Sequence, residues 1–178
     1  MGKYEASRLL DFIKAKVEES RHAGTRVEVL RNQHAEKRRL DELRNQLPGL
    51  KAKGRRGQYV ADALNDLFAE PPLADLKVHV ATCGDDVVGA ASTFSSHGPD
   101  GQPGSTNQIH WVGALETPEG TGTALMYSIA VTAHATKELV WLRATADGRA
   151  FFPAVGFIEG NEFMYWPEEV VNLIASIR

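Results

Sequence analysis

Two glycines, Gly120 and Gly122, stand two residues apart in the stretch ALETPEGTGTALM, between an apolar segment and a helical pattern. A strand, a glycine turn and a helix start in this order point several backbone N–H groups at one place, where the helix dipole adds about half a positive charge. Because glycine has no Cβ, a ligand can come close to those amides. The stretch therefore predicts a phosphate site. A tight strand-to-helix turn without a ligand is the alternative.

Two common nucleotide motifs do not fit this turn. A Walker A loop ends in Gly-Lys-Ser/Thr, which does not occur here. A dinucleotide fingerprint needs a third glycine and an acid that closes the next strand, but position 125 is Leu and Glu138 precedes that strand. The sequence therefore argues against a nucleotide triphosphatase and against a Rossmann dehydrogenase.

The elements that position the turn follow from the hydrophobic periods. Helical spacing predicts helices at 4–22, 40–47, 60–68, 122–136 and 148–155, and from Pro167 onward. Alternating or apolar runs predict strands at 25–31, 76–82, 87–94, 108–115, 139–144 and 163–166. The second helix is expected to end at Pro48-Gly49. This order predicts a mixed α+β (α/β) fold, with a hairpin at 76–94 and one βαβ crossover in the second half.

Composition narrows the class of protein. With 178 residues and 43% hydrophobic residues, the chain is long enough for one well-buried core. The formal net charge of −3 argues against a general nucleic-acid binder. No apolar run approaches the ~18 residues of a membrane span. The single cysteine, Cys83, fits a reducing compartment, so a cytoplasmic protein without membrane contact is expected.

A second motif gives the glycine turn a more specific interpretation. The GNAT family of acyl-coenzyme-A-dependent N-acyltransferases has a pyrophosphate loop, Arg/Gln-x-x-Gly-x-Gly/Ala, which residues 119–124 resemble. Some thirty residues further on, FPAVGF at 152–157 resembles the family's Tyr-x-x-x-Gly-Phe segment. The order of elements from 25 to 166 is also similar to that of the family. The resemblance implies a central mixed sheet, largely antiparallel, with helices on both faces.

The resemblance also implies a division of the chain and a coenzyme site. Residues 25–166 would form the acyltransferase domain, 1–24 a helical extension and 167–178 a closing helix. The pantetheine arm of acetyl-CoA would pair with the strand at Val112 and Ala114, where a backbone N–H would hold the thioester oxygen. The other coenzyme-binding residues would be Glu119, Gly120, Thr121, Gly122, Thr123, Ala124, Leu125 and Phe152. No metal is implied.

The attacking amine must be neutral, so a base or an already deprotonated substrate helps, because a lysine-type amine has an ordinary pKa near ~10.4. The family often places a carboxylate on the strand at 108–115, where this sequence has Gln108 and His110. His110 is the member of this pair that can accept a proton, and we take it as the candidate base. The alternative is an ordinary strand histidine without a catalytic role.

Several side chains depart from the family pattern. Glu119 stands where the family has Arg or Gln, and the loop itself holds no lysine to offset it. Phe152 replaces the tyrosine that can protonate the departing thiolate, and Thr145 replaces an asparagine seven residues earlier. The thiolate would then leave unaided or take a proton from another group, such as Tyr127 or Tyr165.

Three other features each have two interpretations. The basic segment 37–56 would attract an acidic acceptor or the coenzyme's 3′-phosphate, or would be a solvated helix face. The aromatic residues between 151 and 166 would form core, an acceptor-pocket wall or a dimer surface. The loop at 95–107, rich in glycine and proline, would be mobile or would act as a lid.

The expected function is therefore transfer of an acetyl or other acyl group from acyl-CoA to an unidentified amine. A catalytically inactive GNAT-like module is the alternative, either binding a protein partner or acting as a coenzyme-A-binding regulator. A homodimer is a further expectation, and nucleic acid is not expected as a partner because no aromatic interleaves the basic charges.

Overall fold

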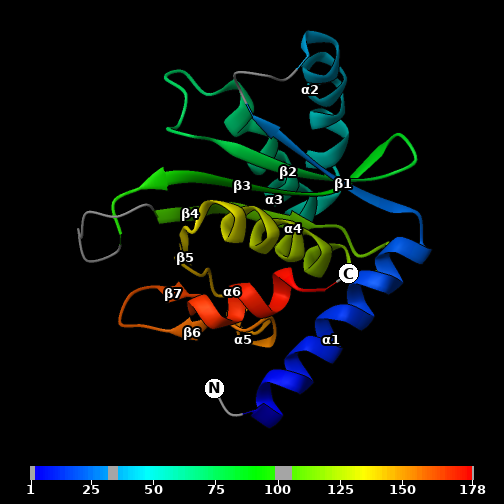
Figure 1. Ribbon diagram of the computed structural model, residues 1–178. Helices are drawn as coiled ribbons and strands as arrows, with labels where there is room; N and C mark the ends of the chain where they lie inside the picture. The colour runs from blue at the N-terminus through cyan, green and yellow to red at the C-terminus, as the bar shows by residue number, and fades with distance from the viewer. Residues whose placement is uncertain (1–2, 32–35, 99–105, 178) are drawn as a thin grey trace.

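The computed structural model describes residues 3–31, 36–98 and 106–177, and a seven-stranded sheet forms its centre (Figure 1). The strands lie in the order β1-β2-β3-β4-β5-β7-β6. Neighbouring strands are antiparallel except β4 and β5, which are parallel and joined by α4. Their bounds are Thr25–Arg31 (β1), Lys77–Cys83 (β2), Asp86–Ser96 (β3), Thr106–Ala114 (β4), Leu139–Leu142 (β5), Ile158–Glu159 (β6) and Met164–Tyr165 (β7). The predicted mixed sheet with one βαβ crossover is confirmed.

Helices cover both faces of this sheet, as expected. One face packs against α1 (Lys3–His22), α4 (Thr121–Thr136) and α6 (Glu168–Ala175), and the other against α2 (Lys37–Lys51) and α3 (Gly54–Asn65) (Figure 1). The described residues also form two short helices, η1 (Asp66–Phe68) and α5 (Phe151–Ala154). Within the described residues, no helix combines the length and apolar character needed to cross a bilayer.

The helices at the two ends of the chain belong to the same core as the sheet. Ile13 and Val17 lie four residues apart on α1, and both are buried in the cluster beneath α4. Val170 and Ile174 of α6 join the same cluster. The helix predicted at 4–22 is confirmed, and α1 lies firmly against the sheet domain. The boundary at residue 24 stays a prediction.

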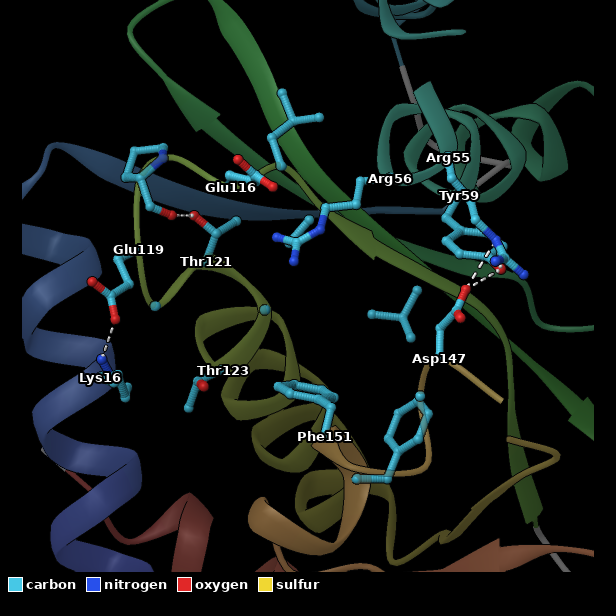
Figure 2. A pocket seen from close by; sticks show the side chains of 18 of the residues that line it. Lys16, Arg55, Arg56, Tyr59, Glu116, Glu119, Thr121, Thr123, Asp147 and Phe151 are labelled. Carbon is cyan, nitrogen blue, oxygen red and sulfur yellow. Dashed lines mark hydrogen bonds and ion pairs between the residues drawn. The ribbon is translucent and has the colours of Figure 1, made fainter. Parts of the chain in front are cut away.

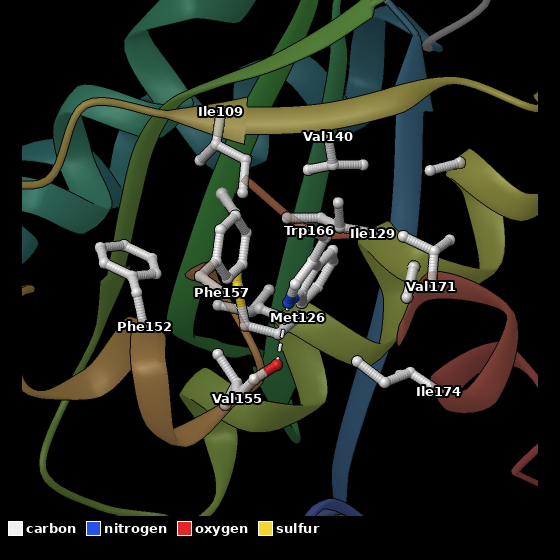
Figure 3. Packing of buried hydrophobic residues seen from close by; sticks show 14 of the residues in the cluster. Ile109, Met126, Ile129, Val140, Phe152, Val155, Phe157, Trp166, Val171 and Ile174 are labelled. Carbon is white, nitrogen blue, oxygen red and sulfur yellow. Dashed lines mark hydrogen bonds between the residues drawn. The ribbon is translucent and has the colours of Figure 1, made fainter. Parts of the chain in front are cut away.

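Trp166 lies at the centre of this cluster and has no exposed surface (Figure 3). Its ring stacks on Phe157 with 4.4 Å between centroids, and its Nε1 donates a hydrogen bond to the carbonyl oxygen of Val155 at 2.9 Å. Phe152 is also buried in the cluster. For these three residues, the interpretation of the aromatic cluster as core holds.

Strands β4 and β5 diverge after a short paired stretch, and this creates an opening in the sheet. Their register runs from Thr106 opposite Leu139 to Ile109 opposite Leu142, where β5 ends. Strand β4 continues to Ala114, so residues 110–114 have no strand partner on that side within the described chain. Free backbone N–H and C=O groups of such an edge are available to a ligand.

Four details differ from the sequence prediction. The helix expected to end at Pro48-Gly49 continues to Lys51, because Leu43 and Leu50 lie two turns apart on its buried side. The last helix begins at Glu168, with Pro167 as an extended N-cap. Strand β6 was not expected, and β5 is two residues shorter than predicted. Of the loop predicted at 95–107, residues 99–105 lie outside the described chain.

Candidate active site

A cavity of about 750 Å³ lies where β4 and β5 separate, beside the glycine turn (Figure 2). Helices α1 and α3, the end of β4, the turn before α4 and the segment after β5 all contribute to its wall. The described lining consists of Phe12, Lys16, Arg55, Arg56, Tyr59, Val112, Ala114, Leu115, Glu116, Pro118, Glu119, Gly120, Thr121, Gly122, Thr123, Thr145, Asp147, Gly148, Phe151 and Phe152.

The turn before α4 presents backbone amides to this cavity. Gly120 is the N-cap, and the first helical hydrogen bond runs from the Ala124 amide to its carbonyl oxygen at 2.9 Å. The amides of the three residues between them therefore have no acceptor within the helix. Because α4 is 16 residues long, its dipole adds positive potential at the same place. The turn can hold an anion of the size of a phosphate.

The two glycines of the turn are needed for different reasons. Gly120 has a φ of +81°, and a Cβ on it would lie 2.2 Å from the backbone oxygen of Lys16 on α1. This glycine is required by its own backbone and by the close approach of a helix, rather than by a ligand. At Gly122 a Cβ would point into the cavity, 3.4 Å from the ring of Phe151 and 3.8 Å from the Cβ of Ala114. Of the two positions, the need to leave space for a ligand therefore explains the glycine only at position 122.

The sequence suggested that no cation offsets the charge of Glu119, but the structure places a lysine beside it. The Nζ of Lys16 lies 2.6 Å from one oxygen of Glu119 and 2.8 Å from Glu19, so α1 supplies the lysine that the loop lacks (Figure 2). The hydrogen bond to Glu119 raises the pKa of Lys16, and the same bond lowers the pKa of Glu119. Both groups are therefore charged at neutral pH.

The opposite wall of the cavity comes from α3. The Nε of Arg55 lies 2.9 Å from the carboxylate of Asp147 and 3.1 Å from the hydroxyl of Tyr59, which itself donates to Asp147 at 3.1 Å. The hydrogen bond to Tyr59, with the charge of Asp147, raises the pKa of Arg55. These contacts tie α3 to the segment after β5, across the opening in the sheet (Figure 2).

Arg56 is the second exposed cation of this wall, and it differs from Arg55 in its contacts. It lines the cavity, and within the described chain it has neither a hydrogen bond nor an ion pair. Figure 2 shows its guanidinium in the space between the turn and Tyr59. An unpaired guanidinium opposite free helix amides is an arrangement that suits a phosphate or a diphosphate.

His110 lies on β4 but outside the described lining of the cavity. The register with β3 shifts at this point, Ser92 facing Trp111 and Thr93 facing Ile109, so His110 is the extra residue of a β-bulge. Its Nδ1 lies 2.9 Å from the carboxylate of Asp66, and 38% of its side chain is exposed.

Asp66 itself is held firmly. Only 11% of its side chain is exposed, and it accepts a hydrogen bond from the hydroxyl of Ser92, which is completely buried. Since a carboxylate accepts hydrogen bonds, Asp66 favours the proton on Nδ1 of His110, and Nε2 keeps the lone pair that a base needs.

The structure brings most of the predicted coenzyme-binding residues together around one cavity. Its lining includes Val112, Ala114, Glu119, Gly120, Thr121, Gly122, Thr123 and Phe152. Ala124 and Leu125 are absent from that lining and are buried within α4. Phe152 is almost fully buried, and its half-buried neighbour Phe151 lines the cavity beside it.

Neither tyrosine suggested as a proton donor lines the cavity. The hydroxyl of Tyr127 donates to the backbone oxygen of Ile177 at 2.8 Å, and Tyr165 lies in β7. Tyr59 is the tyrosine of the described lining. The motif gave no signal for it, because it comes from a helix that the motif does not include.

The basic segment 37–56 divides between its two interpretations. On α2, Arg38 and Arg39 pair with Glu42, and Arg39 also pairs with Glu28. These charges form a solvated helix face. Arg55 and Arg56, at the end of the segment, line the cavity. The basic segment therefore indicated part of the site, namely the two arginines at its end.

Comparisons with known proteins agree with this architecture. No protein-family model matches the sequence, and no curated protein matches it either. Among solved structures, Escherichia coli ElaA is 18% identical and covers 80% of this chain and 99% of its own, with a TM-score of 0.57. A GNAT-family protein from Desulfovibrio desulfuricans is 15% identical over 79% of this chain and 97% of its own, with a TM-score of 0.53. AtaTR bound with AcCoA is 12% identical over 85% and 98%, with a TM-score of 0.58.

Proposed function

Because the chain has the GNAT fold, we propose that it transfers an acetyl or other acyl group from acyl-CoA to an amine. The observation that carries this proposal is that one cavity joins three features. These are the free amides at the start of α4, the unpaired edge of β4 and the unpartnered Arg56. A coenzyme would use all three, because the amides and Arg56 suit its diphosphate and the strand edge suits its amide-bearing arm and its thioester. Residues 25–166 would form the acyltransferase domain, and the protein would act in the cytoplasm.

The diphosphate would lie on the amides of Thr121 to Thr123. Gly122 leaves the necessary room, since a Cβ there would project into the cavity. Arg56 would approach from the opposite wall and supply the charge that the family's loop arginine would otherwise provide. The 750 Å³ of the cavity is within the range of small-molecule sites, about 300–1,000 Å³.

The pantetheine arm would lie beside β4 like an additional strand and would pair with the free edge of β4 at Val112 and Ala114. Both residues line the cavity, and β5 has already ended at that level. An N–H of this edge would stabilise the negative charge that develops on the thioester oxygen when the amine attacks. The amine forms a bond to the carbonyl carbon, the bond from carbon to sulfur breaks, and coenzyme A leaves as the thiolate.

His110 would accept the proton of the amine through Nε2. It lies on the same strand as Val112, two residues away, so the base and the thioester would be neighbours. Departure of the thiolate would not need a strong acid as proton donor. A thiol has a pKa near ~8.5, so its thiolate is a good leaving group. Tyr59 would protonate it by turning its hydroxyl from Asp147 to the sulfur.

An assay for thioester consumption tests the proposed function. The protein would be mixed with acetyl-CoA and a panel of amines that includes polyamines, amino-acid esters and lysine peptides. Loss of the thioester absorbance would be followed, because this signal is independent of the protein's own Cys83. Consumption that depends on an amine supports the proposal, and its absence with every amine contradicts it for those acceptors.

A coenzyme-binding protein without activity is the second candidate. The residue at position 152 favours it, because Phe152 lines the cavity where the family has a tyrosine and offers no hydroxyl there. Binding of coenzyme A without turnover in the same assay would select this candidate. The predicted homodimer stays a prediction.

A further inference from the structure

We propose that α1 is a working part of the coenzyme site, in which Lys16 cancels the charge of Glu119 so that a diphosphate can lie on the turn. This inference rests on the proposed function, because it assumes that the anion on the turn belongs to a coenzyme. It adds to that function an element from the N-terminal helix and assigns a binding role to Lys16.

The first support is the placement of α1 at the cavity. Phe12 and Lys16 both line it, and residues four apart lie on the same side of a helix. Phe12 has 40% of its surface exposed, although it is a large apolar residue. The side of α1 that contacts the cavity therefore differs from the side that carries Ile13 and Val17 into the core.

The second support is the fixed contact between α1 and the turn. The backbone oxygen of Lys16 lies so close to Gly120 that no Cβ could be accommodated there. The turn and the helix are thus held together by backbone packing and by the ion pair between Lys16 and Glu119. The position of Lys16 relative to the amides is set by both contacts.

The third support is the balance of charge around the cavity. The described lining has three cations, Lys16, Arg55 and Arg56, and three acids, Glu116, Glu119 and Asp147. Glu119 stands directly before the N-cap of α4, where it would repel a diphosphate. Without Lys16 the lining would become net negative, and the turn would lose part of its attraction for an anion.

The test is a titration of the parent and variants with coenzyme A in a calorimeter. K16A should weaken binding about five- to tenfold, since one charge at short range near the surface is worth on the order of this factor. Adding E119Q to K16A should restore most of the affinity, because the acid beside the amides is then gone, whereas Glu19, the other partner of Lys16, lies outside the described lining. K14A is the matched control, because Lys14 is an exposed lysine of the same helix outside the described lining, and it should bind like the parent.

A second ligand locates the effect. Dephospho-coenzyme A keeps the diphosphate but lacks the 3′-phosphate, so K16A should weaken it by the same factor. A loss seen with coenzyme A alone would place Lys16 at the 3′-phosphate and overturn the assignment to the diphosphate. Parent-like binding by K16A would overturn the inference and leave the proposed function standing. A parent protein that binds neither ligand would contradict both.

Discussion

The two walls of the cavity are built in different ways. On the side of the turn, the chemistry comes from the backbone, in the free amides before α4 and the free edge of β4. On the side of α3 it comes from side chains, chiefly Arg56 and Tyr59. A backbone site depends on a few local residues and is visible as a motif. A side-chain wall depends on which distant segments the fold brings together, and its members can change while the fold persists.

The largest expected loss of coenzyme A binding comes from a substitution in the glycine turn, on the backbone side of the cavity. G122D would place a carboxylate in the cavity, against the amides, and should weaken coenzyme A binding by more than about a hundredfold through repulsion and lost space. Calorimetry would measure this, with circular dichroism to show an intact fold. G49D is the matched control, because Gly49 is a helical glycine away from the cavity, where an added Cβ would have no atom within 4 Å. Equal losses in both variants would contradict the assignment.

The next effect separates chemistry from binding. H110A should reduce turnover by about a hundredfold, the usual contribution of a general base, with coenzyme affinity unchanged. Steady-state kinetics with the amine that the assay identifies, together with calorimetry, would show this division. Turnover equal to that of the parent across pH 6–9 would return His110 to the role of an ordinary strand histidine.

Asp66 should matter through His110. D66N replaces an acceptor with an amide that can donate to Nδ1, so the proton of the imidazole would move to Nε2. Turnover should fall by about thirtyfold, less than in H110A, because the imidazole is kept and only the position of its proton changes. Nitrogen NMR of the labelled histidine would report the tautomer directly. An unchanged tautomer in D66N would refute the positioning role, whatever the turnover.

The smallest expected effect comes from removing Arg56, on the side of the cavity that is formed by side chains. R56A should weaken coenzyme A binding about tenfold, the value of one hydrogen bond to a charged group, and should leave turnover at saturating coenzyme nearly unchanged. R38A removes an exposed arginine of α2 that pairs with Glu42, and it should bind like the parent. If both variants lose affinity equally, long-range charge would explain the result and Arg56 would have no specific contact.

The sequence indicated the backbone features well, because their causes are local. Strand β1 begins and ends where the alternating pattern predicts, and the helix after the turn begins at Thr121, one residue earlier than expected. Local patterns failed at Pro48, where burial of Leu50 outweighs the cost of a proline within the helix.

Most of the side-chain contacts of the site could not be predicted from the sequence, because the residues that form them are far apart in the chain. Lys16 and Glu119 are 103 residues apart, Tyr59 and Asp147 are 88 apart, and Asp66 and His110 are 44 apart. No spacing rule connects such residues. His110 could be proposed as a base from its strand, but the carboxylate that orients it required the fold.

The central claim is that the cavity beside the turn binds an acyl coenzyme A, and one titration tests it most directly. The parent protein and G122D would be titrated with acetyl-CoA in the same buffer. We expect micromolar binding by the parent and no measurable binding by G122D. No binding by the parent at millimolar acetyl-CoA would contradict the claim, and the turn would then be a structural feature of the fold alone.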